Sequence, residues 1–209
     1  MKVLMLNGSC NEKGCTNRAL QEIATTLKTK NIESEILQLG ASKHHDCTGC
    51  GACRSTLNGQ CIFDDDIVNT LIEKARTADG FIFGTPVYYA HPSGRILSVL
   101  DRAFFAGGKN FSFKPAAAIA SARRAGTTAT LDVLNKYFTI NQMPIVSSTY
   151  WNMVHGRTPA DVEQDLEGLQ TMRNLAENMA YYLKLIELGK QNGIFPPENE
   201  RNFMTNFIR

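Results

Sequence analysis

Four cysteines lie close together in the first third of the chain, in a pattern that could bind a metal or an iron–sulfur cluster. Two residues separate each of the first three and seven residues separate the third from the fourth; they are Cys47, Cys50, Cys53 and Cys61. The two-residue gaps are typical of a loop that wraps an iron–sulfur cluster. Zinc also accepts four thiolates, although its ribbons usually use two separated pairs. A loop of bare thiols is the third interpretation, and all three stay open at this point.

The segment from Gly8 to Asn17 is rich in glycine and hydroxyl-bearing residues and follows the apolar run Lys2–Leu6. We expect it to join a strand to a helix, so that backbone N–H groups and the hydroxyls of Ser9 and Thr16 converge on a phosphate at the helix N-terminus. It has neither the Walker ending nor the three-glycine dinucleotide pattern, so a monophosphate fits better than a triphosphate. An ordinary capped turn is the alternative interpretation.

Five short apolar runs are expected to form the strands that position these residues. They span residues 2–6, 32–39, 81–83, 116–120 and 144–147. Apolar residues at helical spacing lie between the runs, and a last helix follows the capping-box pattern of Thr158-Pro159-Ala160-Asp161 and stops at Gly189. This alternation predicts an α/β fold with a doubly wound parallel sheet and helices on both faces. Ligands of such sheets bind beyond the carboxyl ends of the strands, where the winding reverses.

Composition excludes several classes of protein. The chain has 209 residues with 22 basic and 20 acidic side chains, which suits one α/β domain over residues 1–189 followed by a tail over residues 190–209. The balanced charge gives no basic patch for nucleic acid, and no apolar run approaches the length of a membrane helix. The start MKVLMLNGSC is too short for a signal sequence, and six cysteines without a leader indicate thiols or redox chemistry, so we expect a cytoplasmic protein.

The loop after the first strand resembles the phosphate loop of the NADPH-dependent FMN reductase family, whose usual pattern is Gly-Ser-Pro-Arg-x-x-Gly-Asn-Thr. Gly8-Ser9 and Gly14-Cys15-Thr16-Asn17 carry the resemblance, while Cys10 replaces proline, Asn11 replaces arginine and Cys15 replaces asparagine. The resemblance implies a flavodoxin-like fold with strand order 2-1-3-4-5 and bound FMN. The implied phosphate-loop residues are Ser9, Asn11, Cys15, Thr16 and Asn17.

Two further loops match places where this family contacts the flavin. Pro86-Val87-Tyr88-Tyr89 resembles the stretch that wraps the isoalloxazine ring, with a stiff turn at the proline and with backbone donors and apolar surface for the ring. Ser121, Arg123 and Arg124 follow the fourth strand, where the family contacts the ribityl and pyrimidine side, and one of the two arginines is expected near flavin N1. Core packing of the tyrosines and solvated surface charge for the arginines are the alternatives.

The resemblance implies an oxidoreductase in which NAD(P)H delivers a hydride to FMN, which then reduces a quinone, a free flavin or another small acceptor. No catalytic side chain is required, because the cofactor carries the chemistry. The cysteine motif is similar to that of the iron–sulfur flavoproteins, and this implies a [4Fe–4S] cluster on Cys47, Cys50, Cys53 and Cys61 near the flavin. The alternatives are an electron carrier that serves a protein partner and a flavin-free binding module.

The tail after Gly189 contains bulky apolar residues where a free terminus is usually polar. They include Ile194, Phe195, Phe203, Phe207 and Ile208. We expect the tail to dock on its own domain or across a homo-oligomer, a dimer or tetramer, in which residues near Trp151 help to close the partner's flavin site.

Overall fold

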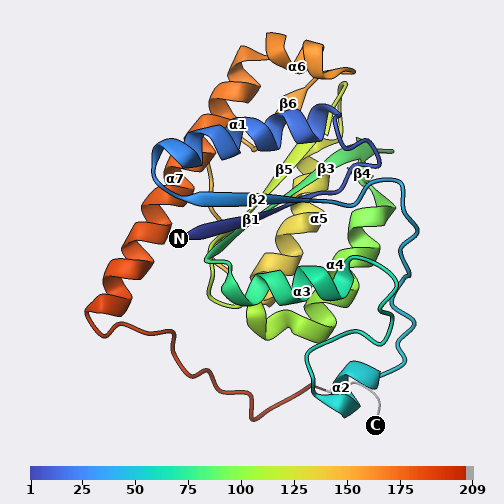
Figure 1. Ribbon diagram of the computed structural model, residues 1–209, viewed down its shortest axis with the longest axis vertical. Coiled ribbons are helices and arrows are strands. Elements are labelled where there is room, and N and C mark those ends of the chain that lie inside the picture. The colour runs from blue at the N-terminus through green and yellow to red at the C-terminus, as the bar shows by residue number, and fades with distance from the viewer. Residues whose placement is uncertain (206–209) are drawn as a thin grey trace.

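A parallel sheet forms the centre of the structure, a computed structural model that describes residues 1–205. Its strands run in the order β2-β1-β3-β5-β6, and the two-residue β4 (His91–Pro92) pairs antiparallel with β3. The five parallel strands are β1 (Lys2–Asn7), β2 (Glu33–Gln38), β3 (Gly80–Tyr88), β5 (Ala116–Ala122) and β6 (Met153–His155). With β4 set aside, this order is the expected 2-1-3-4-5 winding, so the predicted fold class is confirmed (Figure 1).

Helices cover both faces of the sheet. One face packs against α1 (Cys15–Thr29), α6 (Pro159–Gln164) and α7 (Leu166–Gln191), and the other against α3 (Val68–Thr77), α4 (Gly94–Gly107) and α5 (Thr127–Ile140) (Figure 1). A short helix, α2 (Ala52–Thr56), lies in the loop between β2 and α3, and a 3₁₀ turn (Gly108–Asn110) follows α4. Within residues 1–205, none of the helices combines the length and the apolar character needed to cross a membrane.

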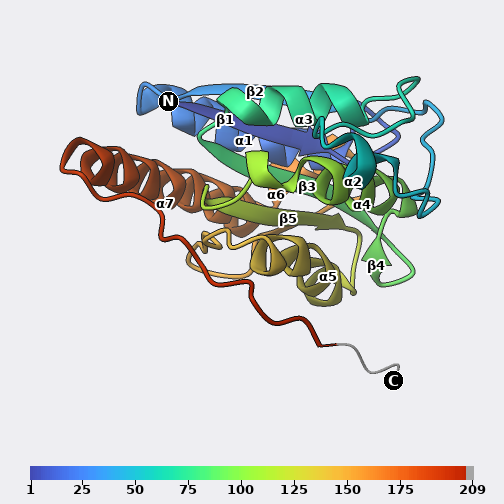
Figure 2. The same ribbon diagram turned by 90° about the horizontal axis from the view of Figure 1, so that it is seen from below.

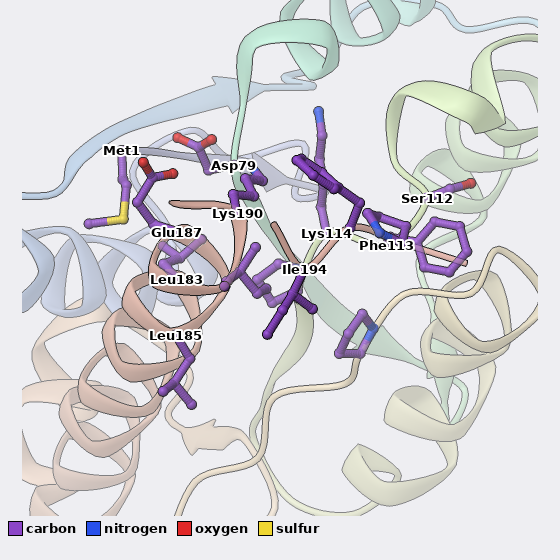
Figure 3. Close-up of a pocket in the computed structure, with 16 residues that line it drawn as sticks. Met1, Asp79, Ser112, Phe113, Lys114, Leu183, Leu185, Glu187, Lys190 and Ile194 are labelled. Carbon is purple, nitrogen blue, oxygen red and sulfur yellow. The ribbon is translucent and has the colours of Figure 1, made fainter. Parts of the chain in front are cut away.

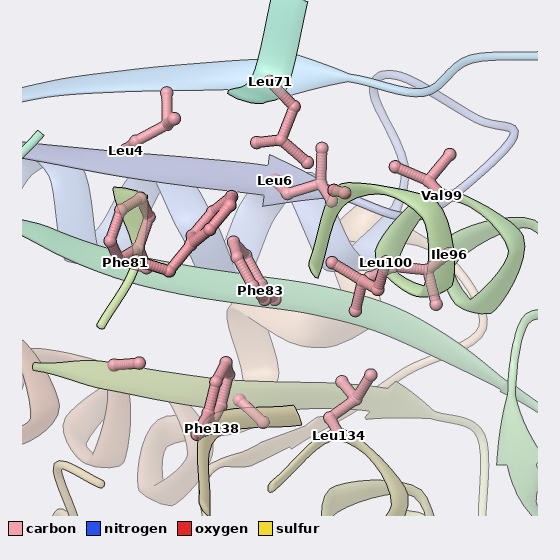
Figure 4. Close-up of a cluster of buried hydrophobic side chains, with 14 of the residues drawn as sticks. Leu4, Leu6, Leu71, Phe81, Phe83, Ile96, Val99, Leu100, Leu134 and Phe138 are labelled. Carbon is pink, nitrogen blue, oxygen red and sulfur yellow. The ribbon is translucent and has the colours of Figure 1, made fainter. Parts of the chain in front are cut away.

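The two faces of the sheet bury separate apolar cores because side chains alternate along each strand. In β1, Val3 and Met5 face α1 and α7, whereas Leu4 and Leu6 face α3 and α4. The core between the sheet and helices α3, α4 and α5 contains a group of aromatic rings around Phe83, which is fully buried (Figure 4). The ring centroid of Phe83 lies 6.0 Å from that of Phe81, 6.2 Å from that of Phe104 and 5.5 Å from that of Phe138.

The predicted fifth strand over residues 144–147 is wrong in position. Ile145 makes only an isolated bridge with Ala116, and the chain then leaves the sheet. The reason is a turn in which the Ser148 hydroxyl bonds to Tyr150 O at 2.6 Å and to Asn152 Oδ1 at 2.8 Å. Regular pairing with β5 begins only at β6, where Met153 lies opposite Ala120.

The predicted last helix is two helices, α6 and α7. The capping box of Thr158 and Asp161 begins α6 as expected. Asp165 then interrupts the helix, because its backbone leaves the helical conformation and its carboxylate accepts from Gly168 N at 2.9 Å to cap α7. The helix continues past Gly189 and ends at Gln191.

The tail leaves the end of α7 and runs along the outside of the domain (Figure 2). Its first apolar residues, Ile194 and Phe195, line a cavity of about 500 Å³ together with Leu183 of α7 (Figure 3). Further along, the Phe203 side chain is 95% exposed, and Phe207 and Ile208 lie outside the described residues. The cavity also contacts Asp79, just before β3, so it lies at the edge of the sheet opposite the loops that follow the strands.

Candidate functional site at the carboxyl edge of the sheet

The register of the sheet brings the three predicted flavin-binding loops together. Asn7 at the end of β1 lies beside Gly84 in β3, and Pro86 in β3 lies beside Ser121 in β5. Gly8 N donates to Gly84 O at 2.7 Å, which ties the first loop to the second. The loops that follow β1, β3 and β5 therefore share one edge.

A close backbone contact joins the second loop to the third. Gly126 has a φ of +98°, and a Cβ at this position would lie 2.5 Å from Ala90 Cα. Glycine is therefore required here on grounds of both conformation and space. The contact fixes the end of the β3 loop against the start of α5.

Short-range hydrogen bonds shape the loop after β1. Ser9 is buried, its backbone N–H donates to Asn7 Oδ1 at 3.1 Å, and its hydroxyl accepts from Asn11 N at 3.0 Å. Asn11 O in turn accepts from Gly14 N at 3.2 Å. Gly14 is the N-cap of α1 and has no side chain with which to cap the first turn. The N–H groups that begin α1 can therefore receive an anion.

Thr16 and Ser121 connect this loop to β5. Their hydroxyl oxygens are 2.7 Å apart, and the two residues are only 1% and 4% exposed. Each hydroxyl has one proton and two lone pairs, so the pair can bond internally and still offer a further donor or acceptor. This pair lies at the first turn of α1, where it can hydrogen-bond to an anion at the helix N-terminus.

Two of the predicted phosphate residues direct their side chains elsewhere. Asn17 Oδ1 accepts from Gln38 Nε2 at 3.0 Å, and the Cys15 thiol donates to Gly156 O at 3.5 Å. Burial raises the pKa of the Cys15 thiol, with a smaller contribution from Asp161, so this thiol stays protonated at neutral pH. The backbone N–H groups of Cys15 and Asn17 and the Asn17 Nδ2 amide remain for an anion.

The tyrosines of the second loop lie at the surface, so their interpretation as core residues is wrong. Tyr88 is about half exposed and Tyr89 is fully exposed, while Pro86 and Val87 are half-buried. Tyr89 and Ala90 adopt left-handed φ values of +52° and +57°, which turn the chain sharply and hold the tyrosines outward. The rings can therefore stack on a planar ligand or on another molecule.

Arg123 and Arg124 follow β5 and are both exposed. His155 in β6 contacts Arg124 through its ring, with Nε2 lying 3.1 Å from Arg124 O. This contact holds the backbone of the loop, and both arginine side chains are open to solvent. The prediction that one of them lies near flavin N1 stays a prediction.

Sequence analysis missed Ser93, which supports the loop after β1. Ser93 is buried at the N-cap of α4, and its hydroxyl donates to Gly8 O at 2.9 Å. Its backbone N–H donates to Thr85 Oγ1 at 3.1 Å. A serine followed by Ile96, Val99 and Leu100 at helical spacing was the signal that could have revealed both α4 and this cap.

The four clustered cysteines line one small cavity. Gly49 and Gly51, with φ values of +65° and +72°, let the chain curl around it. Phe63, Phe105 and Arg102 complete the walls. Each of the six cysteines in the described part of the chain carries a free thiol. Four thiols around a shared cavity are the donor set of a [4Fe–4S] cluster, and the residues fit that group.

The cysteine loop, which we define as residues 39–67 between β2 and α3, begins at the carboxyl edge but then follows α4 away from it. Ser42 O accepts from Arg95, Asp46 accepts from the Ser98 hydroxyl, and His45 O accepts from Arg102. Arg102 lies nine positions after Ser93, which corresponds to about 14 Å along the helix. The cavity therefore lies beside the far half of α4. Among residues 1–205, no three His, Cys, Asp or Glu side chains are close enough to hold a single metal ion.

The last turn of the cysteine loop is fixed by a buried ion pair between Arg102 and Asp66. Both side chains are 1% exposed. Burial raises the pKa of Asp66, but the Arg102 guanidinium and the backbone N–H groups of Val68 and His45 outweigh it, and the pKa is lowered. The carboxylate therefore stays charged at neutral pH.

The fold and the loops at its carboxyl edge define a flavodoxin-like α/β protein with a candidate anion site after its first strand. Residues 1–158 match the model of a family described as NADPH-dependent FMN reductase. The chain therefore belongs to the NADPH-dependent FMN reductase family, and it is a flavin-dependent oxidoreductase.

Relatives agree with the family, and solved structures at low sequence identity share the fold. An iron–sulfur flavoprotein of Methanocaldococcus jannaschii is 30% identical over 195 residues, which cover 90% of this chain and 100% of the relative. The structure of NAD(P)H:quinone oxidoreductase from Methanothermobacter marburgensis is similar with a TM-score of 0.67 at 15% identity, covering 86% of this chain and 98% of that one. A flavodoxin from the domain Archaea gives 0.59 at 14% identity, covering 88% and 99%.

Proposed function

We propose that the protein binds FMN at the carboxyl edge of its sheet and uses NAD(P)H to reduce a small acceptor such as a quinone or a flavin. The observation that carries this proposal is the buried Thr16–Ser121 hydroxyl pair behind the N-terminus of α1. The two hydroxyls, together with the backbone N–H groups that begin α1, can bind a phosphate, and no side-chain cation is needed. The α1 dipole supplies the positive end that favours the anion.

Bound FMN supplies the chemistry, because the flavin can accept the two electrons of a hydride. The chain's own residues bind and orient it. Thr16 and Ser121 hold the phosphate end, Ser93 keeps the loop after β1 in place through Gly8, and the exposed Tyr88 and Tyr89 offer apolar surface beside the ring. Arg123 and Arg124 place positive charge at the rim, where it favours a reduced, anionic cofactor.

The Thr16→Ala variant tests the phosphate assignment. Loss of a hydrogen bond to a charged group will weaken FMN binding by about 1.5–3 kcal/mol, while riboflavin, which has no phosphate, will bind as it does to the wild type. Flavin fluorescence titration measures both affinities. Thr16→Ser keeps the hydroxyl and should restore FMN binding.

Thr25→Ala is the matched control, since Thr25 lies exposed on the same helix. It should leave both affinities unchanged. Equal weakening of FMN and riboflavin by Thr16→Ala would contradict the assignment. A purified protein without a flavin spectrum after incubation with FMN would favour a flavin-free module. If the flavin is bound, NADH and NADPH oxidation assays identify the reductant.

A second candidate function is electron transfer to a protein partner through a [4Fe–4S] cluster. The cavity lined by Cys47, Cys50, Cys53 and Cys61 favours it. A hydride brings two electrons at once, whereas an iron–sulfur cluster passes them singly, so such a protein converts two-electron input into one-electron output.

The exposed tail and the exposed residues Tyr150 and Trp151 suit a homo-oligomer, and the thiol-rich loop suits the cytoplasm.

A further inference from the structure

Among residues 1–205, Arg102 is the largest of the fully buried side chains, and its guanidinium contacts the cysteine loop on both sides of the four cysteines. Before the first cysteine, Nη1 donates to His45 O at 3.3 Å; after the fourth, Nη2 donates to Phe63 O at 3.0 Å. The same group forms the buried ion pair with Asp66. One side chain of α4 thus fastens the two segments that flank the four cysteines.

The third nitrogen of the Arg102 guanidinium, Nε, points at a sulfur atom. Nε lies 3.2 Å from Cys61 Sγ and donates to it. Cys61 is otherwise held through its backbone, since Asn69 Oδ1 accepts from Cys61 N at 2.8 Å and Asn69 Nδ2 donates to Cys61 O at 2.9 Å. The backbone contacts fix the position of Cys61, and Arg102 fixes where its thiol points.

We propose that Arg102 is a positioning residue for Cys61, which it directs into the cavity as a cluster ligand, and that it raises the reduction potential of the cluster held there. This role rests on the [4Fe–4S] cluster of the proposed function. Hydrogen bonds to the ligand sulfurs and local charge are the main means by which a protein sets such a potential.

The direction of the effect follows from charge. Reduction adds one negative charge to the cluster and its thiolates, and an N–H donor with a positive charge beside Cys61 Sγ stabilises that state more than the oxidised one. The Asp66 carboxylate, bonded to the same guanidinium, opposes this effect. Removing the directed donor should therefore lower the potential, and removing the carboxylate's charge should raise it.

Two substitutions with opposite expected shifts provide the test. Arg102→Lys keeps a positive charge, but an ammonium cannot reproduce the planar fork that reaches the sulfur, two carbonyls and a carboxylate together. Asp66→Asn keeps the guanidinium and removes the opposing charge. Arg54→Gln is the control, because Arg54 stacks over Phe105 of the same cavity, 4.3 Å from the ring centroid, rather than bonding to a thiol.

The proteins are reconstituted anaerobically with iron and sulfide. The measurements are iron and sulfide content, cluster retention against a chelator, and the midpoint potential from titration monitored by electron paramagnetic resonance. Arg102→Lys should lower retention by about 10–100-fold and shift the potential downward. Asp66→Asn should shift the potential upward, and Arg54→Gln should shift it less than either variant.

The outcomes separate this role from the cluster itself. Substoichiometric iron and sulfide in the wild type would overturn the cluster and this role with it. A full cluster in the wild type, with the same potential in Arg102→Lys and Asp66→Asn, would overturn the role of Arg102 alone. If Arg102→Lys does not fold, Asp66→Asn decides: an upward shift supports the role and an unchanged or lower potential overturns it.

Discussion

Replacing Cys50 and Cys53 together by serine will abolish the proposed cluster. Iron and sulfide in the anaerobically reconstituted protein will fall to background, because a serine hydroxyl stays protonated at neutral pH and is a poor ligand for iron where a thiolate is required. Reduction of a one-electron protein acceptor by NAD(P)H will stop. Reduction of a quinone will continue, since the flavin loops lie at the other end of α4.

Cys10→Ser and Cys15→Ser are the controls, because these cysteines lie outside the cysteine loop. Both variants should keep the full iron content of the reconstituted wild type. If the wild type itself takes up little iron, and Cys50→Ser leaves NAD(P)H-driven reduction unchanged, then the four cysteines form a structural or redox-thiol loop and the enzyme works on FMN alone.

Replacing Phe83 by alanine will lower the free energy of unfolding by about 3–5 kcal/mol, the usual cost of removing a buried aromatic side chain. Phe83 is fully buried and packs against the rings of Phe81, Phe104 and Phe138. Its removal leaves a cavity in the core between the sheet and α4 that the neighbouring rings cannot fill without moving. Equilibrium unfolding in urea, read by circular dichroism, measures the change.

Ile140→Ala provides the comparison on the surface. Ile140 at the end of α5 is 84% exposed, so its truncation should change stability by less than about 0.5 kcal/mol. A Phe83→Ala variant with stability similar to that of Ile140→Ala would mean that the aromatic group does not behave as the centre of the core.

The sequence predicts the strands whose apolar runs are continuous and end at glycine or a turn. Leu4 and Leu6 in β1 and Phe83 in β3 belong to such runs. Both strands are buried on both faces of the sheet, which makes the pattern strong. The fifth strand was misplaced because Ile145 and Val146 are apolar and touch β5, yet the Ser148 turn removes the residues that follow from the ladder.

The candidate site was predicted as three loops, but not as a set of contacts. The residues of Pro86-Val87-Tyr88-Tyr89 were identified by type, whereas their exposure depends on left-handed backbone at Tyr89 and Ala90, which no spacing reveals. Arg102 was missed for a different reason. A lone arginine in an amphipathic helix normally faces solvent, and only the path of the cysteine loop along α4 makes it buried.

That path has a consequence for how such proteins can diversify. The cysteine loop is attached to the domain through polar bonds to Arg95, Ser98 and Arg102 along one edge of α4, while few of its own apolar side chains enter the cores. The loop contributes no strand to the sheet, although Leu39 at its start is buried in the core. With the proposed cluster in this loop, exchange of the connection between β2 and α3 would add or remove one-electron transfer in a domain of this kind, and the buried guanidinium of Arg102 would have to change with it.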